Sequence, residues 1–253
     1  MPKPCILVSS CRRDQANGYN DAVRLTWAAD KTIPCFFIVG DGGIATRDTV
    51  KLNVPDDYLG LTFKTKESLA WAIRNGFTHV FRSFTDTYVD VKRLADSNFA
   101  DHDYTGNRSD AQAGGYRFAH GGPGYWLGPR AIHILLDAPI EKEKYDWHKF
   151  EDQWVGSTLH SHGIVCVDDK RYSMSMSYLK SEADPLEDND LISAHLSNLT
   201  NQYHPDWMRE VHSKRYGLDY KPTIAREKGC MCENCIALKM GQTPPVWKHQ
   251  RRL

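Results

Sequence analysis

The chain has 253 residues, its 32 Lys and Arg balance 32 Asp and Glu, and 41% of its residues are hydrophobic. This length fits one large α/β domain, or one domain with a small appendage, and the apolar fraction is enough for a sizeable core. A net charge of zero gives no overall electrostatic reason to expect a nucleic-acid or membrane partner. The first apolar run, 5–8, is too short for a signal-peptide core or a membrane span. We therefore expect a soluble, cytoplasmic protein with no membrane partner.

The first third of the chain alternates strand and helix patterns. Short apolar runs predict buried strands at 6–9, 35–39 and 78–81. Helical patterns at 21–29 and 65–75 separate these runs, and the second has Thr65 as a candidate N-cap and Gly76 as a candidate C-cap. Alternating β and α units predict an α/β fold with a mostly parallel sheet and helices on both faces. Ligands of such sheets bind beyond the carboxyl ends of the strands.

Later elements are less regular. Pro129 predicts the start of a helix that ends near Leu136, and a second helix is expected after 151–156. A late strand is expected at 164–167, and the acidic stretch after Ser181 resembles a loop.

Two residues are candidate metal ligands. Asp86 follows the strand that ends near 81, where a carboxylate can reach a divalent cation that bridges two phosphates. His195 offers a neutral imidazole, which suits Mn²⁺. The alternatives are an ordinary capping Asp and a surface or core histidine.

Two further segments could carry chemistry. Gly121 and Gly122 stand in His-Gly-Gly-Pro-Gly, where the lack of side chains lets backbone approach a ligand closely. Glu151 and Asp152 form a carboxylate pair, and one of them could take a proton from an acceptor hydroxyl. The alternatives are a plain turn and a solvated acidic pair at a helix start.

These segments follow one another in order, behind Ser-Ser-Cys-Arg-Arg at 9–13, Arg-Leu-Thr-Trp at 24–27 and Leu-Thr-Phe-Lys-Thr at 61–65. The succession resembles glycosyltransferase family 31, the inverting β-1,3-glycosyltransferases that include galactosyltransferases, Fringe and the core-1 synthase. The resemblance covers about Ile6 to His195. It implies a GT-A glycosyltransferase domain, which we place at 1–203, followed by a basic, Cys-containing appendage at 204–253. It also implies a UDP-sugar donor (UDP-Gal, UDP-Glc or UDP-GlcNAc) and Mn²⁺ or Mg²⁺ between its phosphates.

The resemblance assigns a role to each matching residue. Arg24 and Lys64 fall in family motifs near the donor, and Gly121 and Gly122 form the loop at the donor and acceptor. Asp152 corresponds to the general base.

The same resemblance assigns the residues around the base and the metal. Glu151 stands beside Asp152 on the acceptor side. Asp86 corresponds to the last carboxylate of the metal-binding triplet and His195 to a late metal-ligand histidine.

The chain departs from the family in two ways. The acidic triplet reads Phe84-Thr85-Asp86, so two carboxylates are missing. If metal is dispensable, then Arg82, Lys64 or Arg24 would have to neutralise the leaving diphosphate. The family's membrane anchor and lumenal disulfide pattern are also missing, which favours a soluble bacterial or viral relative.

A cysteine cluster lies beyond the resemblance. Cys230, Cys232 and Cys235 offer three thiolates, and structural Zn²⁺ takes four ligands. His212, His249 or Cys166 could supply the fourth ligand. The alternative is free thiols in a mobile tail.

The acceptor is left open by the sequence. It is a glycan, a protein or a hydroxymethylated base in phage DNA, and we expect 205–253, which is basic and carries several aromatic residues, to recognise it. The alternative for that segment is a helical cover over the sheet with a basic tail. The alternative for the whole chain is a catalytically inactive sugar-binding or nucleic-acid-binding protein.

Overall fold

A computed structural model describes residues 1–112, 114–140, 150–174, 190–196 and 205–217. The chain divides into one compact unit, Met1–Tyr216, and a second, Gly217–Leu253, which lies almost wholly outside the described residues. The first unit includes 205–216, which the sequence analysis placed in the appendage, and the appendage itself remains a prediction.

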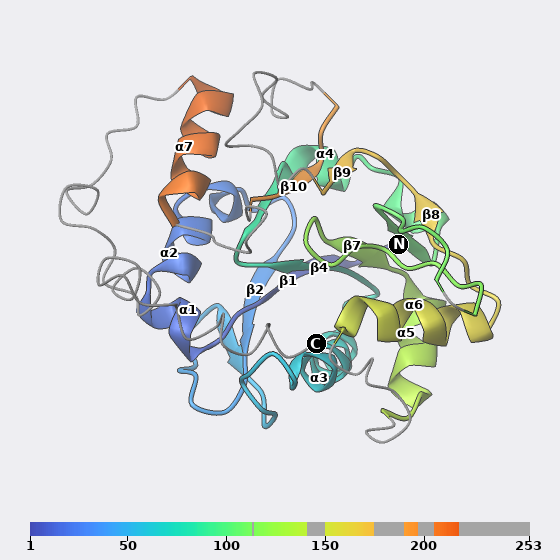
Figure 1. Cartoon of the computed structure of the whole chain (residues 1–253). Coiled ribbons are helices and arrows are strands. Elements are labelled where there is room, and N and C mark those ends of the chain that lie inside the picture. The colour runs from blue at the N-terminus through green and yellow to red at the C-terminus, as the bar shows by residue number, and fades with distance from the viewer. Residues whose placement is uncertain (113, 141–149, 175–189, 197–204, 218–253) are drawn as a thin grey trace, which may run out of the picture. The chain divides into compact units, whose positions relative to one another are not determined.

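The main sheet has seven strands in the order β3-β2-β1-β4-β7-β6-β8 (Figure 1). Strands β1 to β4 run parallel, while β7 is antiparallel to both of its neighbours, β4 and β6. The strands are β1 Pro4–Ser9, β2 Cys35–Val39, β3 Thr49–Lys51, β4 His79–Phe84, β6 Tyr104–Gly106, β7 Tyr125–Leu127 and β8 Val167–Asp168.

A second, smaller sheet has the order β5-β10-β9, with β5 Thr87–Val89, β9 Tyr172–Ser173 and β10 Ser193–His195. Strand β5 follows β4 after two residues and pairs antiparallel with β10. The small sheet therefore continues directly from the end of a central strand of the main sheet.

Helices cover both faces of the main sheet (Figure 1). The helices are α1 Arg12–Ala16, α2 Tyr19–Arg24, α3 Leu61–Arg74, α4 Val91–Ala95, α5 Pro129–Asp137, α6 Glu151–Ser161 and α7 Pro205–Tyr216, with short 3₁₀ turns η1 Trp27–Ala29 and η2 Phe99–Asp101. Helices α3, α5 and α6 share one core with the sheet, and α2, α4 and α7 share the other.

The strand alternation separates these two cores. In β1, Ile6 and Val8 belong to the core under α2 and α7, whereas Cys5 and Leu7 belong to the core under α3, α5 and α6. Because both faces are covered, β2 and the middle of β1 are apolar at successive positions, which is why they form continuous apolar runs in the sequence.

Several predicted elements are confirmed and others need correction. Strand 35–39 has the predicted bounds, and α5 begins at Pro129 as expected. Helix α3 begins at Leu61, four residues early, so Thr65 is not an N-cap but a buried residue inside the helix. The residues 151–156 do not precede a helix but begin α6. The predicted strand at 164–167 is shorter and later, because only Val167 and Asp168 pair with β6.

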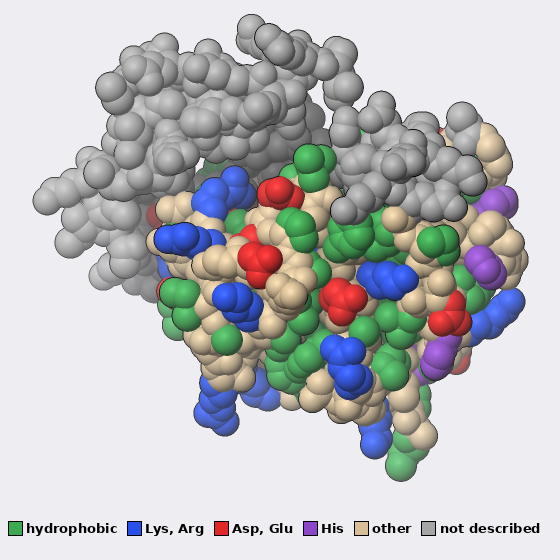
Figure 2. Space-filling model, turned by 90° about the horizontal axis from the view of Figure 1, so that it is seen from below, with side chains coloured by type: hydrophobic (Ala, Val, Ile, Leu, Met, Phe, Trp, Pro, Cys, Tyr) green, Lys and Arg blue, Asp and Glu red, His purple; other side chains and the backbone are tan. Residues whose placement is uncertain are grey.

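No helix of the described residues is long and apolar enough to cross a membrane. On the face that carries α3 and α5, basic, acidic and apolar side chains are interspersed (Figure 2). That mixture agrees with the balanced charge of the sequence.

Candidate functional site

The candidate site lies at the edge of the sheet where β1 and β4 end. The parallel register places Ser9, the last residue of β1, beside Phe84, the last residue of β4. Strand β7 runs the other way and begins at this edge, with Tyr125 paired to Arg82. The segments that follow β1 and β4 therefore meet residues 120–124, which precede β7 and are called the glycine loop below. Open α/β sheets bind their ligands at such an edge.

Asp152, the predicted base, lies in the first turn of α6 against the glycine loop. Its Oδ2 accepts a hydrogen bond from the Gly121 backbone N–H at 3.0 Å. Burial, and then the neighbouring charge of Glu151, raise the pKa of Asp152 to about 6, although two backbone hydrogen bonds favour its charged form. A carboxylate with this pKa can accept a proton close to neutral pH.

Glu151 is buried beside Asp152 and is engaged in a network of its own. Its Oε1 lies 3.0 Å from Arg82 Nε and accepts hydrogen bonds from Thr65 Oγ1, at 2.9 Å, and from the Tyr125 hydroxyl. Its side chain is 1% exposed. In the described structure Glu151 therefore joins α6 to α3, β4 and β7, and it shapes the site through its effect on Asp152.

Asp86 and His195 meet across the small sheet. Their side chains form a contact between Oδ2 and Nε2 at 3.1 Å, and the Leu196 N–H donates to the Asp86 carbonyl at 2.9 Å. The pairing of β5 with β10 brings them together, since Thr87 stands opposite His195. Burial alone would lower the pKa of His195, but the charge and hydrogen bond of Asp86 raise it.

The glycine loop joins Asp152 to the Asp86–His195 pair. A Cβ added to Gly122 would lie 2.7 Å from His195 Cγ, so the loop backbone lies directly against the imidazole. Thr87 Oγ1 also donates to the Gly122 carbonyl at 2.7 Å. The structure thus brings together five of the predicted site residues, namely Asp86, Gly121, Gly122, Asp152 and His195.

Phe84 and Thr85, which occupy the other two positions of the triplet, contact Arg82 and Asp14 and carry no carboxylate. The guanidinium carbon of Arg82 lies 4.0 Å from the centroid of the Phe84 ring, and Thr85 Oγ1 donates to Asp14 at 3.1 Å. Among the described residues, no group of three His, Cys, Asp or Glu side chains could hold a metal ion. Asp86 and His195 suit Mn²⁺ in type, and divalent cations at phosphates are often held by one or two protein ligands plus the substrate. The pair therefore fits a cation whose remaining ligands are phosphate oxygens and water.

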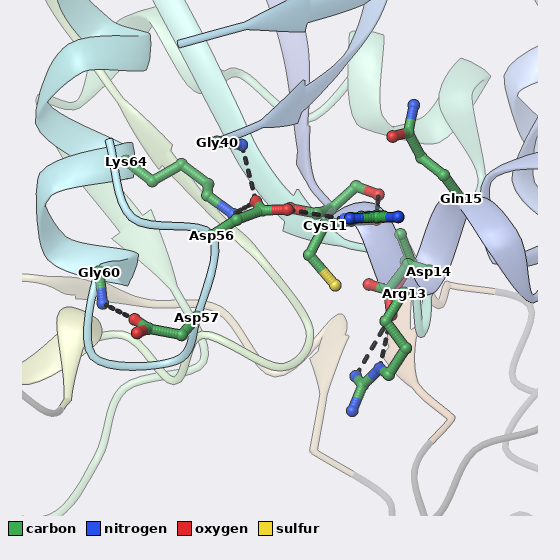
Figure 3. Close-up of polar contacts among 12 residues, drawn as sticks. Cys11, Arg13, Asp14, Gln15, Gly40, Asp56, Asp57, Gly60 and Lys64 are labelled. Atoms are coloured by element: carbon green, nitrogen blue, oxygen red, sulfur yellow. Dashed lines mark hydrogen bonds and ion pairs between the residues drawn. The ribbon is translucent and has the colours of Figure 1, made fainter. Parts of the chain in front are cut away.

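Lys64 is buried at the same edge and is engaged by two acceptors (Figure 3). Its Nζ donates to Asp56 Oδ1 and to the Ser10 carbonyl, both at 2.7 Å. Asp56 also accepts the backbone N–H groups of Arg12 and Gly40, each at 2.7 Å. This pair therefore fixes the loops that follow β1 and β2 next to the start of α3.

Arg24 is not brought to this group. It holds Asp48 with two hydrogen bonds of 2.8 Å and also contacts Asp21. Asp48 directly precedes β3, so this ion pair lies toward the amino ends of the parallel strands, away from the edge where Ser9 and Phe84 lie.

The cysteine cluster, Cys230, Cys232 and Cys235, lies outside the described residues, as does His249. Of the other candidate zinc ligands, Cys166 is buried with its pKa raised to about 12 by burial, and the His212 ring contacts the Tyr88 hydroxyl at 3.2 Å.

Sequence reasoning missed two carboxylates of this region, Asp14 and Asp56. Asp56 lies in the loop between β3 and α3, and no strand was predicted at β3, so nothing in the sequence marked its position. Asp14 lies inside a five-residue helix and is tied to Thr85, 71 residues away, which no local pattern indicates.

No protein-family model matches the chain, and no curated protein matches it. A solved glycosyltransferase involved in the glycosylation of the major capsid of PBCV-1 superposes with a TM-score of 0.52 at 11% identity, over 82% of this chain and 100% of that one. The galactosyltransferase LgtC, in complex with donor and acceptor sugar analogues, superposes with a TM-score of 0.48 at 16% identity, over 88% of this chain and 99% of that one.

The first of these structures shows that the chain has the GT-A glycosyltransferase fold, which confirms the predicted fold class. At this identity the likeness shows the fold alone and does not single out family 31.

Proposed function

We propose that this protein is an inverting glycosyltransferase that moves a sugar from a UDP-sugar to a hydroxyl acceptor. The observation that carries the proposal is the position of Asp152, held by the Gly121 N–H with a pKa of about 6. The same loop contacts His195, which pairs with Asp86. In this proposal Asp152 is the proton acceptor on one side of the loop, and Asp86 and His195 bind the phosphates of the donor on the other.

The proposed reaction is a single displacement. Asp152 accepts the proton of the acceptor hydroxyl while its oxygen attacks the anomeric carbon of the donor. The bond from that carbon to the diphosphate oxygen breaks, and UDP leaves with the electron pair. The Gly121 N–H keeps Asp152 oriented as it gains the proton.

Asp86 and His195 would hold Mn²⁺ or Mg²⁺ together with the donor's phosphates, where the cation would supply positive charge to the leaving diphosphate. Lys64 and Asp56 keep the loops after β1 and β2 in place for the nucleotide. We also propose that the protein acts in the cytoplasm of a bacterium or of a virus-infected cell, as a relative of family 31.

The direct test is a donor screen that measures UDP release from UDP-Gal, UDP-Glc and UDP-GlcNAc. Glycan, protein and hydroxymethylated-DNA acceptors are supplied in parallel, with the Asp152→Asn variant as the matched control. Acceptor-dependent release by the wild-type chain, lost in the variant, supports the proposal. UDP-sugar binding without release for every donor and acceptor would favour the inactive sugar-binding alternative.

We further propose that the cysteine cluster binds about one Zn²⁺ per chain, because three thiolates at this spacing suit a tetrahedral site. Elemental analysis of the purified protein, with titration of its thiols, tests this. Freely titrating thiols and no zinc would contradict it.

A further inference from the structure

Near Asp86 lies another charged side chain, Arg13, to which the family resemblance assigns no role. Thr85 Oγ1 donates to Asp14 Oδ2 at 3.1 Å, and Asp14 Oδ1 accepts from Arg13 Nη2 at 3.2 Å and from Arg13 Nε at 3.4 Å. A chain of contacts thus leads from the residue before Asp86 to a guanidinium on α1 (Figure 3 shows Arg13 and Asp14). The Asp14 carboxylate therefore links the Arg13 guanidinium to Thr85, the residue before Asp86.

Lys64 and Arg82, two of the cations that the sequence suggested for the diphosphate, already form buried ion pairs. Lys64 and Arg82 are each 2% exposed and are paired with Asp56 and Glu151. Removing one partner from a buried ion pair leaves the other charge uncompensated, which is costly. These two side chains therefore hold the fold together and are poorly suited to turn toward a ligand that comes and goes.

Arg13 differs from them in exposure and in its partner. Its side chain is 62% exposed, and its ion pair is with the adjacent residue of its own helix. An exposed pair of this kind contributes little to stability, so it can rearrange at small cost. Asp14, by contrast, is 10% exposed and is held by Thr85, so it is a fixed carboxylate beside Arg13. The Arg13 Nη1 group has no hydrogen-bond partner among the described residues, and guanidinium groups bind phosphate oxygens in a bidentate way.

We propose that Arg13, paired with the Asp14 carboxylate that Thr85 holds, binds the diphosphate of the donor and supplies positive charge there in addition to any cation held by Asp86 and His195. The inference rests on the proposed function, since it takes a nucleoside diphosphate to be the donor's leaving group. It makes Arg13 a substrate-binding residue and leaves the proton transfer to Asp152.

The experiment compares the binding of UDP and of uridine by isothermal titration calorimetry in excess EDTA, so that no metal contributes. The variants are Arg13→Gln, Arg13→Lys and the control Arg171→Gln. Arg171 is also a partly exposed arginine paired with a carboxylate two residues away, Asp169, so its loss removes the same charge from a different place. Circular dichroism melting confirms that each variant is folded.

We expect Arg13→Gln to weaken UDP binding about 10-fold to 100-fold, as for the loss of a hydrogen bond between charged groups, and to leave uridine binding unchanged. Arg13→Lys should restore part of the affinity, and Arg171→Gln should bind as the wild type does. Equal UDP affinity in Arg13→Gln and the wild type would overturn the role of Arg13 while the proposed function stands. Failure of the wild-type chain to bind UDP or any UDP-sugar, with metal or without, would overturn both.

Discussion

The environment of Asp152 stabilises its protonated form, because the carboxyl group is mostly enclosed and lies next to the charged Glu151. Replacing it by Asn keeps an oxygen for the Gly121 N–H but removes the proton acceptor. We expect Asp152→Asn to lower sugar transfer by about 10²–10⁴-fold, with UDP-sugar affinity within about two-fold of the wild type. Initial rates of UDP release and calorimetric donor binding measure the two effects.

The matched control is Glu67→Gln, which removes an exposed carboxylate on α3. In the wild type, kcat/KM should rise with pH through about 6 and level off above it, because the base must be ionised. Near wild-type turnover of Asp152→Asn would remove this residue from the mechanism.

The same raised pKa has a consequence for stability. The pKa of Asp152 is about 6 in the folded chain and near its ordinary value of 3.8 in the unfolded chain, so the folded state binds the proton more tightly. Stability is therefore lost as pH rises through 6. The rise in its pKa from 3.8 to about 6 corresponds to about 3 kcal/mol, so Asp152→Asn should melt several degrees above the wild type at pH 7.5. The difference should vanish near pH 4, and an equal difference at both pH values would contradict this account.

In the proposed function, Asp86 and His195 are two of the ligands of a phosphate-bound cation. We expect Mn²⁺ to raise activity, and Asp86→Ala or His195→Ala to weaken Mn²⁺ binding measured by electron paramagnetic resonance in the presence of UDP. His133→Ala, on the exposed side of α5, is the control for removal of an imidazole. Full activity of the wild type in excess EDTA would show that cationic side chains neutralise the diphosphate without metal.

At the scale of elements, the glycine loop packs directly against strand β10 at Gly122 and His195. A methyl group on Gly122 would lie 2.7 Å from His195 Cγ, whereas one on Gly121 would meet the Phe84 ring at 3.3 Å. Gly122→Ala must displace the imidazole or the loop, so we expect it to weaken Mn²⁺ and UDP-sugar binding at least ten-fold more than Gly121→Ala does. Comparable donor affinity in the two variants would show that the loop is not constrained by His195.

How far the sequence predicts these elements depends on whether the pattern is local. Strand 35–39 and the helix at Pro129 were correct because apolar runs and a Pro at the first helical turn are local signals. Short elements such as β5 and β10 were missed, because three residues carry too little periodicity, and their pairing joins residues about 100 positions apart. The role of Thr65 was misread for a similar reason, since its partner Glu151 lies 86 residues away.

The site was predicted in the same uneven way. Asp86, His195, Gly121, Gly122 and Asp152 could be named from ordered motifs, and the structure brings them together. The motifs could not show that Lys64 would form a buried ion pair with Asp56, or that Arg24 would pair with Asp48 away from this edge. A charged residue type can be read from sequence, but its counterion is set by tertiary packing.

At the scale of the whole molecule, helix α7 is part of the compact unit. Met208 and Val211 are fully buried, and Arg215 Nη2 lies 2.8 Å from Asp90 Oδ2, at the residue that caps α4. A truncation ending at Tyr203 should therefore lose several kcal/mol of stability, at about 1.5–3 kcal/mol for each buried apolar side chain. A truncation ending at Gly217 should keep the wild-type melting temperature.

These two truncations separate a structural role of the C-terminal region from acceptor recognition. If residues 218–253 recognise the acceptor, the chain ending at Gly217 should still bind UDP-sugar but lose transfer. If it transfers normally, the acceptor is recognised by the rest of the chain. Equal melting temperatures for both truncations would show that α7 contributes nothing to the fold.

The pairing of β5 with β10 also determines when the proposed UDP-sugar site can form during synthesis. Asp86 and His195 are 109 residues apart, and contacts of such sequence separation form late because a long loop must close first. Ribosomes add about 5–20 residues per second, so for several seconds the nascent chain has β5 without β10 and Asp86 without His195. Ribosome-bound chains stalled before residue 193 should therefore fail to retain UDP-sugar, while chains released after β10 and α7 have emerged should bind it.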